Sequence, residues 1–529
     1  MRTAVYNRYW ATGGGAEKYG AAIAQILSAE GRLDLVSHDP VDVDWLSDRL
    51  RLDLSAVDLR LLDDATGEVT KASADYDLFV NVSYMSADRV TSPGSLYVVH
   101  FPTRLDGHLS RAQRAVARGL TALGTAESPT MEWGSGFYPR EGRRGGVAWT
   151  NGRAKLRFRT KPGVPTSVQF VFGRLRPPQL GPTPVRIEVA GEVAAEVELG
   201  TPASRVAARR GVAVSVDVVS PEAGVPIGVE IISDTFVPAA VLHTDDRRRL
   251  GVPLVGLNVG TGPLAAASRW LPSIFYPPAT VDWLDSYSLV VANSVFTQRW
   301  IDTYWSRGSE VLYPPVTMHA AGSKQPAILN VGRFFPTDKG HSKKQLELVL
   351  AFRRLCDAGV RGWRLHLVGG CSAAGQGYLD EVRSAADGYP IDLHVNARGD
   401  ELDGLYAEAS IYWHASGLGE HGERHPERLE HFGISTVEAM SAGAVPVVIG
   451  MAGQRETVRH GVDGFHFQTL DGLCALTTSL IEDDALRRRM SASAAQRARR
   501  FAVDAFATQL HALVDRALVP DQGQPRVRS

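Results

Sequence analysis

The sequence predicts an α/β protein with two doubly wound, parallel-sheet domains and an all-β segment. Three observations predict this class. Residues 1 to about 125 alternate apolar, strand-like runs with helical patterns, and this rhythm returns after about residue 285. Between them, short alternating runs are spaced by Gly, Pro and polar turns, as in antiparallel sandwiches. The chain has 529 residues, and this length predicts roughly two to four domains.

The composition argues against several classes of protein. A net charge of −1 makes nucleic acid an improbable partner. Cys356, Cys371 and Cys474 lack metal-ligand spacing and fit a reducing compartment without disulfides. The N-terminus enters a strand-like run at residues 3–7 without a signal-peptide pattern, and no apolar run has membrane length. We therefore expect a soluble, cytoplasmic protein.

The first α/β region carries a glycine-rich turn between its first strand and helix. We expect strands at residues 3–7, 33–37, 57–62, 77–82 and 96–101, and a helix over 16–29. Adjacent glycines at 13–15 let the backbone approach a ligand and place free amides at a helix start. A dinucleotide fingerprint would need glycine at the position of Lys18, and a P-loop ending is absent. A ligand-facing loop and a plain tight turn both stay open.

His100 follows the last strand of this region. In an open α/β sheet the ligand crevice lies beyond the carboxyl ends of the strands, so this position faces the crevice. A lone histidine is more often a hydrogen-bonded structural residue. Both interpretations stay open on this observation alone.

The middle segment predicts an antiparallel sandwich inserted into the first α/β domain. Its alternating runs place apolar side chains on one face of each strand. The expected strands are residues 156–159, 168–172, 185–189, 212–216 and 228–232. Either Trp149 or Trp133 could stack on a sugar ring or lie in the core, and this segment loosely resembles carbohydrate-binding modules.

The α/β rhythm resumes with a strand and Asn-Ser helix cap at residues 287–294 and a strand at 310–316. The second domain begins with a strand at 327–334, followed by strands at 365–368, 391–395 and 411–414. Arg333 lies at the end of its first strand, and Lys339 lies in the next loop.

Residues 430–446 contain two carboxylates around a predicted helix start. Gly433 permits the turn, Ser435 or Thr436 can cap free amides, and Pro446 opens a strand after the helix. A helix N-terminus suits a phosphate, and a carboxylate nearby can accept bonds from hydroxyl groups. We therefore expect an anion that carries hydroxyls, although such glutamate pairs are also common on surface helices.

These segments resemble the retaining GT-B glycosyltransferases of family 4 (glycosyl transferases group 1). The likeness is carried by residues 13–17, His100, Arg333, Lys339 and 430–438, in that order along the chain. It implies that Glu430 contacts the donor sugar and Glu438 the nucleotide ribose. It also implies that backbone amides meet the sugar and diphosphate, namely those of Phe432, Gly433 and Ile434.

The same resemblance assigns the remaining site residues. His100 is implied to contact the donor sugar, while Arg333 and Lys339 grip the diphosphate. The glycine-rich loop is implied to face the cleft near the donor phosphate and the acceptor. The residues of that loop are Gly14, Gly15 and Glu17.

The resemblance implies two Rossmann-like domains that face a cleft, with the sandwich inserted in the first. The charged segment 420–428 suggests a loop over the cleft, and we expect the terminal helices to cross back onto the first domain. The expected boundaries are 1–127 and 251–318 for the first domain, 128–250 for the sandwich, 319–484 for the second domain, 485–518 for the crossing helices and 519–529 for a disordered tail.

The implied activity is retaining transfer of a sugar from a nucleotide-diphosphate sugar to a hydroxyl of a glycan or glycolipid, in cell-surface polysaccharide synthesis. The resemblance implies no metal or other cofactor, and it leaves open a peripheral contact at the inner face of the membrane. A sugar-nucleotide epimerase and a non-catalytic glycan-binding protein remain alternatives. The nucleotide, sugar, acceptor and oligomeric state stay unassigned.

Overall fold

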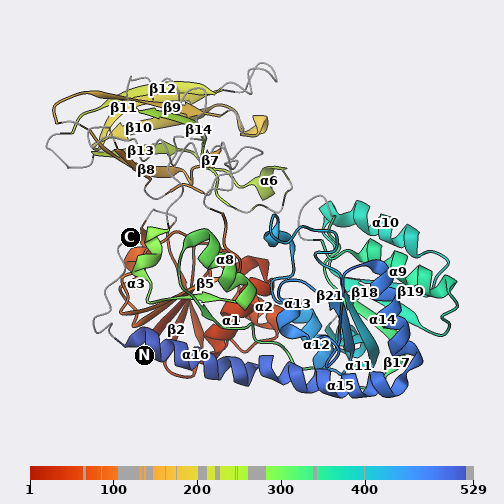
Figure 1. The fold of residues 1–529 in the computed structure, drawn as a ribbon. Helices are drawn as coiled ribbons and strands as arrows, with labels where there is room; N and C mark the ends of the chain where they lie inside the picture. The colour runs from red at the N-terminus through yellow and green to blue at the C-terminus, as the bar shows by residue number, and fades with distance from the viewer. Residues whose placement is uncertain are drawn as a thin grey trace.

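A computed structural model shows two α/β domains side by side and a pair of antiparallel sheets next to the first (Figure 1). No helix in the described part of the chain is both long and apolar enough to cross a membrane. The structure describes residues 1–63, 67–84, 86–104, 130–133, 136–138, 147–160, 162–173, 176–200, 211–220, 227–242, 244, 246, 248–259, 281–336, 342–397 and 399–519.

The first domain is built on a seven-stranded sheet in the order β16-β15-β5-β4-β1-β2-β3. All its pairings are parallel, as predicted. Its central strands are buried along almost their whole length, which explains their continuous apolar runs. The strands are β1 (Arg2–Tyr6), β2 (Arg32–Ser37), β3 (Val57–Leu61), β4 (Leu78–Asn81), β5 (Gly94–Val99), β15 (Leu289–Ala292) and β16 (Glu310–Val311).

The helices of this domain follow its strands. They are α1 (Gly15–Ser28), α2 (Val43–Leu50), α3 (Glu68–Ser73) and α8 (Val295–Trp305). Helix α1 buries Ala21, Ala24 and Leu27 against strand residues that include Val5 and Val80. This packing holds the glycine-rich turn at the carboxyl end of the sheet.

In sequence, two antiparallel sheets lie between β5 and β15 of the first domain. Their orders are β11-β10-β13-β8-β6 and β12-β9-β14-β7, and both contribute to one apolar core that includes Leu156, Phe170 and Ile187. The strands are β6 (Thr130–Trp133), β7 (Ala148–Trp149), β8 (Arg153–Arg159), β9 (Thr166–Phe172), β10 (Thr183–Val189), β11 (Glu192–Leu199), β12 (Val212–Val218), β13 (Ile227–Ser233) and β14 (Pro253–Val259).

Strand β14 corrects one expected boundary. We expected residues from 251 onward to rejoin the first α/β domain, but β14 pairs antiparallel with β9 and β7. An apolar run shows that a strand forms, yet it does not show which sheet that strand joins. The chain instead returns to the parallel sheet at β15.

The tryptophan that could have stacked on a sugar is part of an apolar cluster. Trp149 is only 8% exposed and meets Phe236 edge to face, with ring centroids 5.9 Å apart. Its ring therefore serves packing. The side chain of Trp133 lies outside the described residues.

The second domain has a six-stranded parallel sheet in the order β19-β18-β17-β20-β21-β22. This sheet and that of the first domain confirm the predicted α/β class. Its strands are β17 (Gln325–Val331), β18 (Arg364–Gly369), β19 (Ile391–Val395), β20 (Ala409–His414), β21 (Val445–Ile449) and β22 (Phe465–Phe467). Its helices are α9 (Gln345–Asp357), α10 (Gln376–Ala386), α11 (Gly399–Glu408), α12 (Ile434–Ser441), α13 (Gln454–Thr457) and α14 (Leu470–Glu482).

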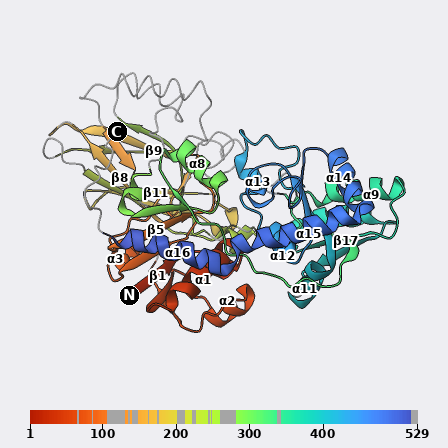
Figure 2. The same cartoon turned by 60° about the horizontal axis from the view of Figure 1, so that its bottom comes forward.

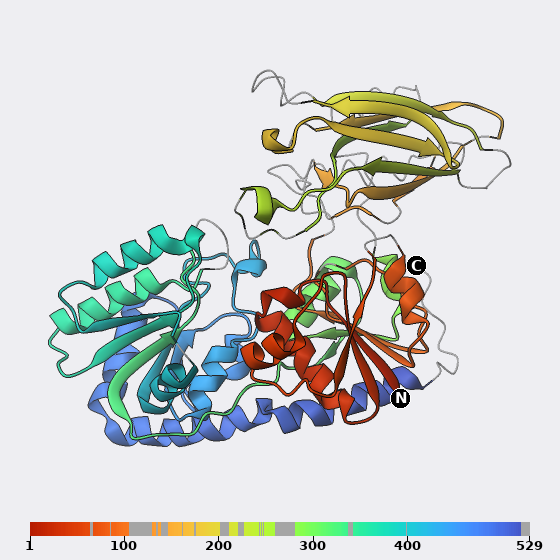
Figure 3. The ribbon, with the colours of Figure 1, turned by 180° about the vertical axis from the view of Figure 1, so that it is seen from behind.

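Two terminal helices span both domains (Figure 2). Helix α15 (Asp484–Ala498) packs on the second domain, where Ala494 joins the cluster of Val437 and Met440. Helix α16 (Val503–Leu518) packs on the first domain, with Phe506 and Leu510 in its core. Figure 3 shows from behind how these helices run beneath the two parallel sheets. Apart from Val519, the expected disordered tail lies outside the described residues.

Candidate functional site

Helix α12 begins at a glycine whose conformation a side chain would strain. Gly433 is the N-cap, with φ of 99°, and an added Cβ would lie 2.6 Å from the Gln454 amide nitrogen. The expected capping by Ser435 or Thr436 is wrong. Ser435 Oγ instead accepts a hydrogen bond from the Tyr412 hydroxyl at 2.8 Å, and Thr436 Oγ1 accepts one from Gln454 at 3.0 Å.

The helix start therefore keeps its backbone donors available. Within the described part of the chain, no acceptor meets the amides of the three predicted residues or of Ser435. The side chain of Phe432 is only 2% exposed and packs against Tyr313 and Phe501. Free amides and the positive end of the helix dipole suit an anion. The predicted amides are those of Phe432, Gly433 and Ile434.

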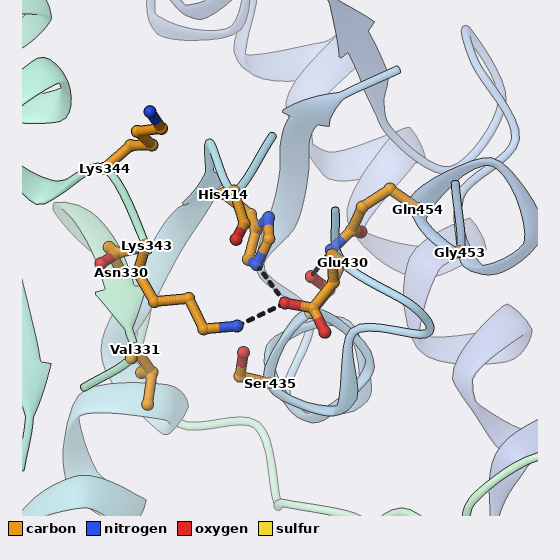
Figure 4. Close-up of polar contacts among 12 residues, drawn as sticks. Asn330, Val331, Lys343, Lys344, His414, Glu430, Ser435, Gly453 and Gln454 are labelled. Carbon is orange, nitrogen blue, oxygen red and sulfur yellow. Dashed lines mark hydrogen bonds and ion pairs between the residues drawn. The ribbon is translucent and has the colours of Figure 1, made fainter. Parts of the chain in front are cut away.

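Two basic side chains hold one oxygen of the Glu430 carboxylate. Lys343 Nζ lies 2.5 Å from Glu430 Oε2, and His414 Nε2 lies 3.0 Å from the same atom (Figure 4). The side chains of Glu430 and Lys343 are 15% and 20% exposed, and that of His414 only 1%. Gly453 donates its amide to the Glu430 carbonyl at 3.0 Å. These contacts fix both the backbone and the carboxylate of Glu430.

His414 is held as a neutral hydrogen-bond donor. Burial lowers its pKa, and the hydrogen bond to Glu430 only partly opposes this effect. Because Nε2 faces the carboxylate oxygen, the proton of the neutral ring must lie on Nε2. Nδ1 is buried and meets no donor in the described part of the chain. The imidazole therefore orients Glu430 without adding a positive charge.

The second carboxylate, Glu438, connects the two domains. It accepts a hydrogen bond from the buried Tyr406 hydroxyl at 2.8 Å. Its other oxygen lies 3.8 Å from Nζ of Lys18, on α1 of the first domain. Lys18 also donates to Thr317 Oγ1 at 3.0 Å. The residue that departs from the dinucleotide fingerprint thus brings the glycine-rich turn next to α12.

The glycine-rich turn is shaped by its own glutamate. Glu17 is only 5% exposed and accepts bonds from the Gly14 amide at 2.9 Å and from Asn7 at 3.2 Å. This is a capping arrangement, so Glu17 orders the turn. An added Cβ on Gly15 would meet nothing within 4 Å. The exposed part of the loop is thus its backbone at Gly14 and Gly15.

His100 lies just beyond β5, as the strand-end argument predicted. Its ring meets Tyr19 edge to face, with centroids 5.7 Å apart. Burial lowers its pKa, while Glu17 and a hydrogen bond with the Val82 backbone oppose the shift. Its Nε2 is buried without a hydrogen-bond partner among the described residues. A buried polar atom without a partner is unusual, which makes His100 a candidate to meet a ligand hydroxyl.

The predicted basic pair is only half within the described residues. Arg333 is exposed just after β17, and its guanidinium has no ion-pair partner in the ranges that the structure describes. Lys339 lies outside those ranges. Arg333 is thus an accessible cation on the side of the second domain that carries α12.

Sequence reasoning missed four residues that contact the two glutamates: Lys18, Lys343, Tyr406 and His414. One of them had a signal. His414 ends a buried strand, as His100 follows one, so the same strand-end argument would have found it. The other three meet their partners through tertiary folding, and no local pattern marks them.

The long charged segment joins both domains. Within it, Glu420 lies 3.4 Å from Lys344 and 3.3 Å from Arg428. Glu423 reaches Arg299 on α8 of the first domain at 2.9 Å. The segment therefore lies at the junction of the domains, next to the strand end that carries His414.

A known family matches the second domain and the start of the crossing helices. Residues 318–497 match the model of the family "Glycosyl transferases group 1". This range begins before β17 and ends within α15. It includes Glu430, Glu438, Arg333 and the four free amides of α12.

Curated relatives match over part of their length. A GDP-Man:Man(3)GlcNAc(2)-PP-Dol alpha-1,2-mannosyltransferase of Dictyostelium discoideum is 29% identical over 203 residues, which are 34% of this chain and 38% of the relative. The enzyme of that name from Xenopus laevis is 26% identical over 230 residues, 39% of this chain and 42% of the relative. The match thus spans about two fifths of these relatives.

Solved structures share the overall architecture. HepE from Anabaena, crystallised with UDP and glucose, has a TM-score of 0.51 and 13% identity, covering 97% of this chain and 99% of its own. Sucrose-phosphate synthase from Thermosynechococcus elongatus has a TM-score of 0.50 and 13% identity, covering 97% and 98%. At this identity the likeness concerns the fold. These structures support a GT-B fold, and the match over residues 318–497 is what supports the family of glycosyl transferases group 1.

Proposed function

Since residues 318–497 match glycosyl transferases group 1 on a GT-B frame, we propose that this chain is a retaining glycosyltransferase of the family-4 type. It moves a sugar from a nucleotide-diphosphate sugar to a hydroxyl of a glycan or lipid-linked glycan. One observation carries the proposal. The free amides of α12 lie between two oriented carboxylates, Glu430 and Glu438, at the junction of two parallel-sheet domains.

The diphosphate is proposed to bind at the start of α12. The amides of Phe432, Gly433 and Ile434 are proposed to donate to the sugar and diphosphate, with the free amide of Ser435 as a further donor. Arg333 supplies a positive charge. Lys339 is proposed as a second cation. These donors stabilise the leaving group most when the bond to the sugar has broken, so they lower the barrier and not only the binding free energy. This part of the proposal needs no metal ion, and activity should survive EDTA.

The two glutamates are proposed to bind hydroxyls at different points of the donor. Glu438 accepts from the ribose, and Glu430, held by His414 and Lys343, accepts from the transferred sugar together with His100. The bond from the anomeric carbon to the diphosphate breaks as a bond to the acceptor oxygen forms on the same face. The acceptor proton passes to a diphosphate oxygen. Positioning and charge, without a protein nucleophile, carry this mechanism.

The relatives guide the choice of donor and acceptor. The names of the curated relatives specify GDP-mannose and a dolichol-linked glycan, while HepE was crystallised with UDP and glucose. We propose a hexosyl donor and a lipid-linked acceptor, used in cell-surface polysaccharide synthesis. Such an acceptor would place the enzyme at the inner face of the membrane.

The test is a donor panel read by mass spectrometry and NMR. GDP-mannose, UDP-glucose and dTDP-sugars are incubated with the protein and lipid-linked or free glycan acceptors. Transfer with the anomeric configuration kept supports the proposal, and an inverted product contradicts the retaining mechanism. Free epimerised sugar nucleotide would indicate an epimerase. If the protein binds nucleotide sugars but forms no product with the complete panel, the proposal that it is an enzyme is wrong.

A further inference from the structure

An aromatic stack joins the two domains directly beside His100 and Glu430. Phe101 follows His100, and His431 follows Glu430. Their rings lie parallel within 13°, with centroids 4.1 Å apart. Phe296, on α8, stacks on both rings at 6.0 and 6.1 Å. Phe101 and His431 are each one residue from a predicted sugar contact, so the stack constrains the spacing between those contacts.

Glu456 makes the polar contact next to this stack. Its two oxygens accept from the amides of Phe296 at 2.7 Å and Val295 at 2.9 Å. Ser294 caps α8 through the Thr297 amide. Among the described residues, the acceptors of the first two helix amides therefore come from the other domain alone. A carboxylate at this end also interacts favourably with the helix dipole.

Glu456 joins two segments, and each of them is hydrogen-bonded to the backbone of a predicted site residue. On the first domain, the residues around the start of α8 hold the His100 carbonyl, through Asn293 Nδ2 at 3.0 Å and Thr297 Oγ1 at 3.4 Å. On the second, Gly453 precedes the short helix of Glu456 and donates to the Glu430 carbonyl at 3.0 Å. An added Cβ on Gly453 would lie 2.2 Å from a backbone oxygen, so the two segments pack closely.

We propose that Glu456 is a positioning residue: by joining α13 to the start of α8, it aligns His100 with Glu430 across the domain junction. The inference rests on the proposed function, because it needs both residues at the donor sugar. Glu456 acts through the backbone of α8 and of Gly453 and does not touch the donor. Its contribution therefore belongs to turnover and not to nucleotide binding.

The chain offers a matched control on the same helix. Arg299, also on α8, pairs with Glu423 of the second domain at 2.9 Å, but both side chains are exposed, at 59% and 73%. An exposed ion pair of this kind contributes little to the free energy that holds the domains together. Glu423→Gln thus removes a domain contact of α8 without altering its first amides or the aromatic stack.

The experiment compares Glu456→Ala and Glu456→Gln with Glu423→Gln. A small misalignment of reacting groups can cost about 100-fold, so we expect kcat for sugar transfer to fall about 10- to 100-fold in Glu456→Ala. Glu456→Gln keeps an acceptor oxygen but no charge, so its loss should be smaller. Glu423→Gln should keep wild-type kcat. Calorimetry should show the affinity for free nucleoside diphosphate unchanged within about threefold in all three, because the diphosphate and ribose contacts stay intact.

Three outcomes would overturn the inference. These are wild-type kcat in both Glu456 variants, equal loss of kcat in Glu423→Gln, and a parallel loss of nucleotide affinity. Glu456→Gln keeps the volume of the side chain, so it covers the case in which Glu456→Ala does not fold. If the wild type transfers no sugar, the proposed function fails, and small-angle scattering still tests the positioning. Saturating nucleoside diphosphate should then reduce the radius of gyration of the wild type more than that of Glu456→Gln, and equal reductions would contradict the inference.

Discussion

At the scale of single residues, the site is a set of carboxylates held in place before any ligand binds. Glu430 is fixed by a neutral imidazole and an ammonium group, and Glu438 by a phenol and by an ammonium group from the other domain. Such fixing reduces the entropy that must be lost in reaching the reactive geometry. Arg333 adds a cation that has no acidic partner among the described residues.

Removing Arg333 should damage turnover more than binding. Its guanidinium is exposed and pairs with no acid in the described part of the chain, so its charge can stabilise the departing diphosphate. We expect Arg333→Ala to lose about 2 to 4 kcal/mol of transition-state stabilisation, or about 30- to 1000-fold in kcat/KM. Steady-state kinetics checks this value, with Arg333→Lys as the control that keeps the charge. Near-wild-type turnover in Arg333→Ala would refute the assignment.

The two glutamates should fail in different ways. Glu438→Gln should weaken binding of the bare nucleoside diphosphate, because the ribose loses its charged acceptor. Glu430→Gln should lower turnover while that nucleotide still binds, because its contact is with the transferred sugar. Calorimetry with the nucleotide separates these effects. Equal loss of nucleotide affinity in both variants would contradict the division of roles.

The buried His414 should make the protein less stable in acid. Its pKa is lowered by burial, so the folded state keeps the ring neutral while the unfolded chain binds a proton as pH falls through about 6.5. Stability from this site is present above that pH and is lost below it, by at most about 1.4 kcal/mol per pH unit. His414→Gln keeps an N–H donor but cannot titrate. Urea unfolding midpoints at pH 7.5 and 5.5 should therefore differ less in His414→Gln than in the wild type, and an equal difference would refute the argument.

At the scale of elements, local sequence patterns predicted the features that depend on neighbouring residues alone. The parallel strands, the turn at Gly433 and the strand-end position of His100 all follow from patterns within a few residues. The contacts of Lys343 and His414 with Glu430 join positions 87 and 16 residues apart, and sequence spacing does not show them. The predicted capping was wrong for a related reason. The side chains of Ser435 and Thr436 accept hydrogen bonds from Tyr412 and Gln454 and do not bind the helix amides.

The hairpin of β10 and β11 also shows the limit of local sequence patterns. Its turn residues, Ala190 and Gly191, have φ of 54° and 89°, the left-handed pair that a two-residue hairpin needs. Gly191 was a visible signal, but the alanine before it carries a strained conformation that no propensity favours. Pairing with β10 gives β11 its place at the edge of the sheet.

At the scale of the whole molecule, the antiparallel sheets have an apolar core of their own and lie next to the first domain (Figure 1). The buried members of that core fall between residues 154 and 257, and none of the predicted donor residues lies in this range. Near the end of this range, Arg248 is close to the turn after β1. Burial raises the pKa of Tyr9 in that turn, and the Arg248 guanidinium partly lowers it.

Replacing residues 130–259 by a Gly/Ser linker should therefore separate acceptor recognition from donor chemistry. The two parallel-sheet domains keep their cores and the crossing helices, so the shortened chain should fold and bind nucleoside diphosphate with wild-type affinity. Because Arg248 places this segment beside the turn on the first domain, we expect the apparent KM for a polymeric acceptor to rise. Slow hydrolysis of the donor, which needs no acceptor, should stay at the wild-type rate. Kinetics with a long and a short acceptor provides the measurement. Lost nucleotide binding in a folded deletion variant would mean that the sheets support the donor site, and an unchanged KM for both acceptors would rule out contact with the glycan.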